Sequence, residues 1–225
     1  MQRCISILEE TMNKSMRVII SRGLATSAVL AVVVLGMPAT YAALTTNSTL
    51  SQGITAGTLS TSIRDASGVV VPTPSFAMTS VAASTSAQTA TGTFGNNAQR
   101  ITVDNPNAAN AGWVLSLAAT GGASATWTSG ANTYAYNGTT TTGQLTINPA
   151  ASTLTPTGAN TATGITKGTA ATFTAATPIT LLTAAAASED VWNGFLTGIG
   201  VSQLIPASQP VGTYTIDLTQ TVTAS

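Results

Sequence analysis

Apolar residues recur at every second position along much of this chain, and this two-residue period constrains the fold more than any other feature. Alternation places the large apolar side chains of the segment 113–117 on one face, and the segment 214–222 shows the same pattern. Shorter candidate strands are 101–103, 145–147, 179–181 and 199–205. Gly-Gly, Asn-Gly and Pro-containing turns separate these segments. The pattern predicts an all-β fold, an antiparallel β-sandwich or barrel.

One segment departs from this pattern. Residues 184–187 are four consecutive alanines, followed by Ser188, Glu189 and Asp190. Alanine has the strongest intrinsic helix propensity, so a short helical turn is expected here.

The first 42 residues have the pattern of an export signal. Lys14, Arg17 and Arg22 precede an apolar run over 24–35, and small residues end at Ala42. The run is shorter than the roughly 20 apolar residues that a membrane-spanning helix needs. We therefore expect a cleaved signal helix over 1–42, a secreted product of one domain over 43–225, and no membrane segment in the mature form.

Charge is scarce in residues 43–225, which hold three Lys or Arg and five Asp or Glu, with no His and no Cys. Without a basic patch, nucleic acid is not an expected partner. Without His or Cys, and with carboxylates scattered along the chain, neither a catalytic triad nor a metal or other cofactor site is indicated. The composition predicts a disulfide-free protein that is not an enzyme.

Oxygen-bearing side chains cluster in residues 104–110, which read Asp-Asn-Pro-Asn-Ala-Ala-Asn. Oxygen atoms are the ligands that calcium prefers, but only one carboxylate is present. Asx residues and proline are also what a tight turn requires. The segment is interpreted as a turn, with calcium as the alternative.

Aromatic residues flank a candidate hairpin loop at 129–132. If the loop joins two strands, Trp127, Tyr134 and Tyr136 lie on one face. Such a platform stacks on sugar rings, which makes these three residues candidates for wall or glycan contact. Aromatic pairs across strands also stabilise a sheet by roughly 0.2–1 kcal/mol, which is the structural alternative.

Two stretches resemble motifs of the WxL-domain surface proteins. Residues 103–117 contain Val-Asp-Asn-Pro and then Gly-Trp-Val-Leu-Ser-Leu, similar to that family's Asp-led turn before a Gly-Trp-x-Leu strand. Residues 205–219 resemble the family's closing strand. The match is carried by Asp104, Gly112, Trp113, Leu115, Tyr214 and Leu218.

The resemblance implies an exported, non-catalytic bacterial surface protein that associates non-covalently with the cell wall, with peptidoglycan as its partner. The family's second Trp falls at Gln220 of this sequence, so any wall contact made by that ring is absent here. The two-residue period independently places Trp113 on the core face of its strand, where we expect it to be buried rather than displayed.

A second resemblance begins at residue 42. Residues 42–44 and 54–59 are similar to the opening of the camelysin and TasA-like fibre proteins, which are β-rich subunits of extracellular matrix. Strand edges without charged side chains favour edge-to-edge assembly. The alternative function is therefore a self-assembling fibre or surface-layer subunit whose partners are copies of itself, joined through sheet edges or through residues 44–59.

Overall fold

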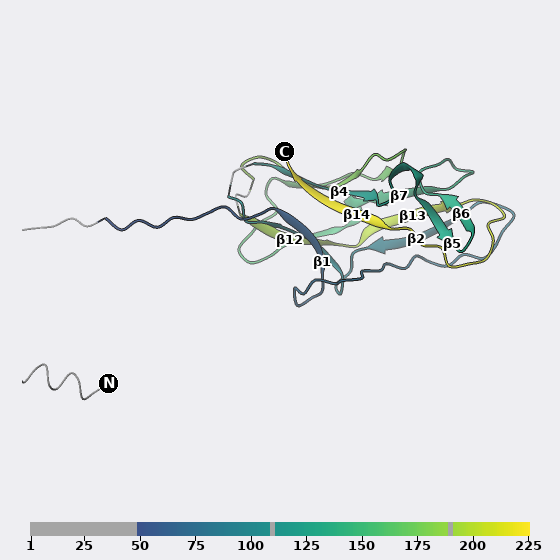
Figure 1. The fold of residues 1–225 in the computed structure, drawn as a ribbon, viewed down its shortest axis with the longest axis horizontal. Helices are drawn as coiled ribbons and strands as arrows, with labels where there is room; N and C mark the ends of the chain where they lie inside the picture. Colours follow the sequence, from purple (N-terminus) through teal and green to yellow (C-terminus); the bar gives the residue numbers. More distant parts are fainter. Residues whose placement is uncertain (1–48, 109–110, 189–190) are drawn as a thin grey trace, which may run out of the picture. The chain divides into compact units, whose positions relative to one another are not determined.

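The computed structural model of the protein describes residues 49–108, 111–188 and 191–225. The chain divides into two units, Met1–Ser51 and Gln52–Ser225. The expected signal helix over 1–42 lies outside the described residues. The second unit starts at an extended segment and ends at the carboxyl terminus (Figure 1).

This unit is an all-β domain of antiparallel strands, as the sequence predicts, with two short 3-10 turns, η1 (Gly122–Ser124) and η2 (Pro149–Ala151). The first sheet contains, in spatial order, β1 (Ser60–Arg64), β3 (Arg100–Asn105), β12 (Trp192–Thr197) and β8 (Thr153–Pro156). The second contains β10 (Ala171–Thr172), β7 (Gln144–Asn148), β13 (Ile199–Ile205) and β2 (Gln88–Phe94). The third contains β14 (Leu218–Ala224), β4 (Trp113–Ala119), β11 (Ile179–Ala184) and β9 (Ile165–Lys167). A separate hairpin joins β5 (Thr126–Ser129) to β6 (Asn132–Ala135).

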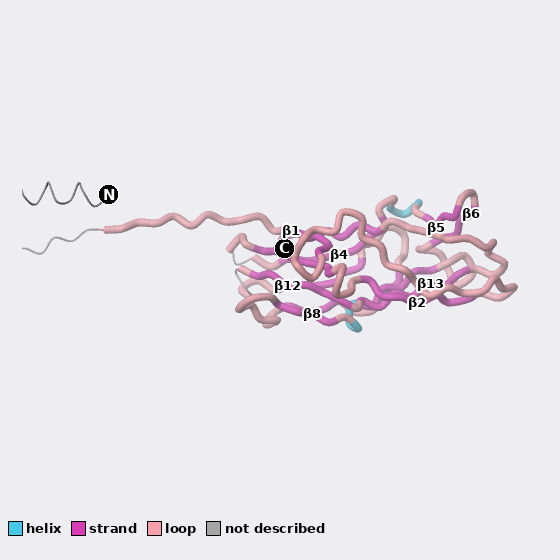
Figure 2. The backbone as a smooth tube through the Cα atoms, turned by 90° about the horizontal axis from the view of Figure 1, so that it is seen from below, coloured by secondary structure: helices cyan, strands magenta, loops and turns pink. Residues whose placement is uncertain are grey.

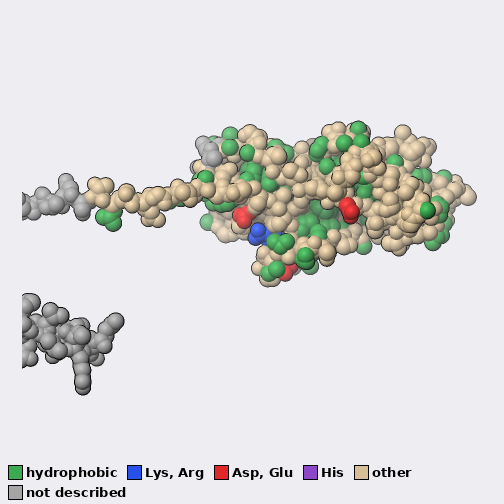
Figure 3. Space-filling view, viewed as in Figure 1, with side chains coloured by type: hydrophobic (Ala, Val, Ile, Leu, Met, Phe, Trp, Pro, Cys, Tyr) green, Lys and Arg blue, Asp and Glu red, His purple; other side chains and the backbone are tan. Residues whose placement is uncertain are grey.

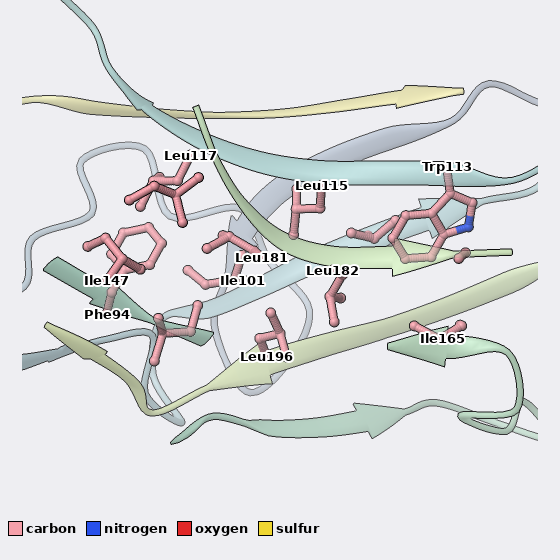
Figure 4. Close-up of a cluster of buried hydrophobic side chains, with 14 of the residues drawn as sticks. Phe94, Ile101, Trp113, Leu115, Leu117, Ile147, Ile165, Leu181, Leu182 and Leu196 are labelled. Carbon is pink, nitrogen blue, oxygen red and sulfur yellow. The ribbon is translucent and has the colours of Figure 1, made fainter. Parts of the chain in front are cut away.

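The first and third sheets face each other across a hydrophobic core. Strand β4 buries every second residue, beginning with Trp113, which is 2% exposed, so the expected burial of this residue is confirmed. Its ring packs against Trp192 of β12, with the ring centroids 5.4 Å apart. Figure 4 shows Trp113, Leu115 and Leu117 pointing from β4 into the buried cluster. Each fully buried side chain of this size contributes roughly 1.5–3 kcal/mol, so this alternation is a main source of stability.

The first two sheets are connected by a kink at two glycines. Gly198 alone separates β12 from β13, and its N–H donates to the carbonyl of Gly95, 2.8 Å away. Both glycines have positive φ, 71° and 85°, which other residues adopt only at a cost. Figure 2 shows the result, with β12 beside β8 and β13 beside β2 in successive parts of the domain.

The closing strand is shorter than predicted. The two-residue period favoured a strand over 214–222, whereas β14 begins at Leu218. Before it, Thr215 makes a single bridge with Thr128 of β5. The half-buried pattern nevertheless continues through Tyr214 and Ile216, because the chain stays extended while it crosses to another partner.

The helical turn expected after residue 183 is absent from the described residues, so that prediction is wrong. Ala184 is the last residue of β11, where it pairs with Trp113 on one side and with Ile165 on the other. Ala187 lies in a turn with φ of 61°. Two neighbouring strands override the local propensity of alanine. Glu189 and Asp190 lie outside the described residues.

Candidate functional site

A groove of about 620 Å³ lies between the β5–β6 hairpin and the second sheet. Its walls come from β2, β13, the irregular segment 75–84 and the segment 209–215. We call it the aromatic groove, after Trp127, Tyr134 and Tyr214, which line it together with Gln203 and Gln209. The end of the domain that carries this hairpin shows no charged side chain on the face drawn in Figure 3.

The hairpin places two of the predicted aromatic residues side by side. Strands β5 and β6 pair with Trp127 opposite Tyr134, and the turn between them contains Gly130 with φ of 59°. The two rings stack with centroids 6.1 Å apart and planes 13° apart. The ring of Tyr214 also packs on Tyr134, with the ring centroids 5.0 Å apart. The three rings form a row in which Tyr134, the middle one, is 8% exposed while Trp127 and Tyr214 are half-buried.

A buried glutamine fixes the orientation of Trp127. Gln203 of β13 is 1% exposed, and its side-chain oxygen accepts a hydrogen bond of 2.7 Å from Trp127 Nε1. Its Nε2 donates to the carbonyl of Leu204 at 2.7 Å and lies 3.4 Å from that of Ala135. Because an unpaired amide would be costly at this depth, these bonds hold both the glutamine and the indole in place.

Tyr214 is held by polar contacts at its hydroxyl, which donates to the carbonyl of Pro210 at 2.8 Å and accepts from Gln209 Nε2 at 2.9 Å.

Burial, reinforced by the neighbouring Tyr214, raises the pKa of Tyr134 to about 12. This phenol therefore stays neutral at physiological pH. Among the residues that the structure describes, those lining the groove include no Asp, Glu, Lys, Arg, His or Cys.

Tyr136 does not lie on the aromatic row, although the alternation predicted the same face as Trp127. Its side chain is fully buried, its ring contacts Phe173 edge-on at 5.2 Å, and its hydroxyl lies 2.9 Å from the carbonyl of Gly122. The hairpin ends at Ala135, and the Tyr136 carbonyl then accepts from the N–H of Leu145 in β7. Tyr134 thus lines the groove, whereas Tyr136, two residues further along the same face of the chain, lies in the core.

The other residues of the family motif lie mostly in the core. Leu115 is fully buried, Leu218 is half-buried, and Gly112 lies where three segments meet. A Cβ atom at Gly112 would stand 2.6 Å from the carbonyl oxygen of Ala184 and 2.6 Å from Oγ of Ser225, so only glycine fits without a shift. At these positions, the need to pack the core closely is sufficient to explain the residue types of the motif.

Gln220, at the position of the family's second Trp, is half-buried between β14 and β1. Its Nε2 donates to Oγ1 of Thr61 at 2.9 Å, and its Oε1 is buried without a hydrogen-bond partner. The side chain therefore joins the edges of the third and first sheets.

The candidate calcium segment starts differently from the predicted turn. Asp104 and Asn105 belong to β3, with Asn105 buried and the Asp104 carboxylate 3.8 Å from the guanidinium of Arg64. Within residues 49–108, 111–188 and 191–225 no three His, Cys, Asp or Glu side chains are grouped as metal ligands. The predicted turn is therefore wrong for Asp104 and Asn105, which are strand residues, while 106–108 follow the strand and residues 109–110 lie outside the described residues.

Several residues of the groove and core were not predicted. Gln203, Gln209 and the segment 75–84 come from parts of the chain far from the hairpin, and only the tertiary fold brings them to it. Trp192, the core partner of Trp113, donates from Nε1 to the carbonyl of Thr161 at 2.8 Å. Trp192 is the first residue of β12, in which every second position is buried, so this short alternation was the available signal.

No protein-family model, curated protein or solved structure matches the chain. The resemblances to WxL-domain and TasA-like proteins therefore stay predictions. Over the residues that the structure describes, no helix has the length and apolar character needed to cross a membrane.

Proposed function

We propose that the protein is a secreted, non-catalytic structural protein of the bacterial cell surface that binds a cell-wall polymer through the aromatic groove. The observation that carries this proposal is the row of aromatic rings in a groove whose lining, over the described part of the chain, holds no charged side chain. Sugar rings present apolar faces that stack on Trp and Tyr. The half-buried Trp127 and Tyr214 at the ends of the row offer the ring surface for such stacking.

The same lining supports a binding role rather than catalysis. General acid–base chemistry needs titratable side chains within hydrogen-bond reach of the reacting atoms. Among the described lining residues, the titratable groups are the hydroxyls of Tyr134 and Tyr214, and that of Tyr214 is engaged at both its proton and its oxygen. Secretion is supported by the pattern of residues 1–42.

Sedimentation with insoluble peptidoglycan tests the proposal. The wild-type protein should co-sediment, Trp127→Ala should remain in the supernatant, and Trp127→Phe should retain most of the binding. The phenylalanine variant keeps an aromatic face while losing the hydrogen bond to Gln203. A folded Trp127→Ala variant that sediments like wild type would refute binding through this groove.

Assembly of copies is a second candidate, favoured by one observation. Residues 49–58 form no strand and are exposed, with Leu50 93% and Ile54 91% exposed. Large apolar side chains this accessible on an extended segment are suited to pairing with a sheet edge of another copy.

Deleting residues 44–59 separates the two candidates. Loss of polymers in electron micrographs, with wall binding retained, would assign assembly to that segment. A wild-type monomer that fails to sediment with peptidoglycan at every salt concentration would refute both candidates.

A further inference from the structure

Charged side chains gather at one place on this nearly uncharged domain. A hollow of about 250 Å³ is lined by Arg64, Asp65, Arg100 and Asp104, together with Asn193 and Phe195. The other described Asp, Glu, Lys and Arg residues of the unit are Lys167 and Asp217. Figure 3 shows basic and acidic side chains lying close together on one part of the surface. We call this hollow the arginine pocket.

The register of the first sheet places two arginines directly opposite each other. Arg64 of β1 pairs with Arg100 of β3, on the face opposite to the buried Ile101. Like charges at opposed positions destabilise a sheet, so packing alone does not favour this pair. Asp104 lies further along the same face and pairs with Asn193 of β12.

Both guanidinium groups are held in defined orientations. Arg100 lies over the ring of Phe195, 4.4 Å from its centroid, and donates to the side chain of Asn97, while its Nε is buried without a partner. Arg64 donates from Nε to Oγ of Ser62 at 2.9 Å. Its Nη2 is 3.8 Å from Oδ2 of Asp104, which is beyond hydrogen-bond distance. The Arg64 guanidinium and the Asp104 carboxylate therefore do not use up each other's hydrogen-bonding capacity.

The polar groups of the pocket match a ligand that both donates and accepts hydrogen bonds. Arg64 supplies donors, Asp104 supplies acceptors, and Asn193 supplies both. Thr102 and Thr157 also line the hollow, where their hydroxyl groups donate to the carbonyls of Ser62 at 2.7 Å and Asn193 at 3.2 Å and keep acceptor capacity. A sugar ring has the same mixed character, because each of its hydroxyl groups donates and accepts.

The charge balance excludes strongly charged ligands. An anion would face the carboxylates of Asp65 and Asp104, and a cation would face two guanidinium groups. Hydrogen bonds from Ser67 and Val69 lower the pKa of Asp65, so this carboxylate remains ionised while it fixes the loop beside the pocket. The balanced charges favour a neutral ligand.

We propose that the arginine pocket binds one neutral sugar residue of a polysaccharide, as a second contact in addition to the one made by the aromatic groove. The choice of a polysaccharide rests on the proposed function. Two weak contacts to the same polymer reinforce each other through effective concentration. The pocket therefore adds to retention at the wall without any covalent bond.

Nuclear magnetic resonance on the exported, ¹⁵N-labelled protein tests the proposal with the N-acetylglucosamine tetramer as the probe. The expected product contains two arginines, so the Nε–H signals of Arg64 and Arg100 are directly assignable by substitution. Both should shift saturably with the tetramer. Asp104→Asn should weaken this binding about tenfold, as expected for loss of one charge-assisted hydrogen bond. Lys167→Gln, which removes a cation outside the pocket, should leave it unchanged.

The outcomes separate this inference from the proposed function. If the protein sediments with peptidoglycan while the tetramer leaves both arginine signals unmoved, the pocket assignment is wrong and the proposed function stands. If both signals shift while the protein fails to sediment, the pocket assignment stands and wall binding is refuted. Saturable shifts with inorganic phosphate at lower concentrations than with the tetramer would overturn the assignment to a neutral sugar.

Discussion

Replacing Trp113 with alanine tests whether the central residue of the family motif serves packing or binding. The side chain is 2% exposed and packs on Trp192 at 5.4 Å, so the substitution removes a buried indole and leaves a cavity between the first and third sheets. Truncations of this kind cost about 3–5 kcal/mol. For a domain of 150–250 residues each kcal/mol shifts Tm by about 2–4 °C, so a fall of roughly 6–20 °C is expected.

Circular dichroism with thermal and urea denaturation measures this loss, and peptidoglycan sedimentation of the folded fraction should remain intact. Trp113→Phe, which refills part of the volume, should lose less stability than Trp113→Ala. The half-buried Trp127 provides the opposite control, since Trp127→Ala should affect binding more than stability. An unchanged Tm for Trp113→Ala, combined with loss of wall binding, would show that Trp113 is a contact residue and that the packing argument is wrong.

Three further predictions follow from the described contacts. Gly112→Ala should destabilise the domain by about 1–3 kcal/mol in urea denaturation, because its Cβ would stand 2.6 Å from the Ala184 carbonyl oxygen; an unchanged midpoint would contradict this close approach. Gln203→Leu should cost about 1–3 kcal/mol and shift the fluorescence emission of Trp127, since Nε1 loses its acceptor; wild-type stability and emission would argue against that hydrogen bond. The pKa of Tyr134 is about 12 in the folded protein and about 10 in the unfolded chain, so the unfolded chain loses this proton at a lower pH. The contribution of Tyr134 to the free energy of unfolding is therefore fully present below pH 10 and is lost as the pH rises from 10 through 12. Urea denaturation should show a smaller loss over this range in Tyr134→Phe, and parallel curves for both proteins would refute the assignment.

Strands with a clear apolar alternation, such as β4, were predictable from the sequence because alternation is a local property. The period around Trp113 reports directly which residues face the core, and β4 follows it. The segment 199–205 also forms a strand, β13, but only Ile199 and Gln203 are buried in it, so alternation did not identify its core residues. The end of β11 was not predictable in this way. Ala184 has helical propensity, but its conformation is set by pairing with strands distant in the sequence.

The candidate site was only partly predictable for the same reason. The hairpin that pairs Trp127 with Tyr134 is local and was expected. The departure of Tyr136 into the core depends on its pairing with β7, and the arrival of Tyr214 and Gln203 depends on the arrangement of three sheets. The opposed pair of Arg64 and Arg100 likewise depends on the register between β1 and β3, which no spacing in the sequence specifies.

Quenching of tryptophan fluorescence by acrylamide tests wall-polymer binding in the aromatic groove most directly. The chain has three tryptophans, of which Trp113 and Trp192 are 2% and 1% exposed, so Trp127 is the one that acrylamide reaches. Soluble peptidoglycan fragments should protect the wild-type protein from quenching in a saturable manner, and Trp127→Phe should show no protection. If the wild-type protein sediments fully with insoluble peptidoglycan while soluble fragments leave its quenching by acrylamide unchanged, binding in this groove is contradicted.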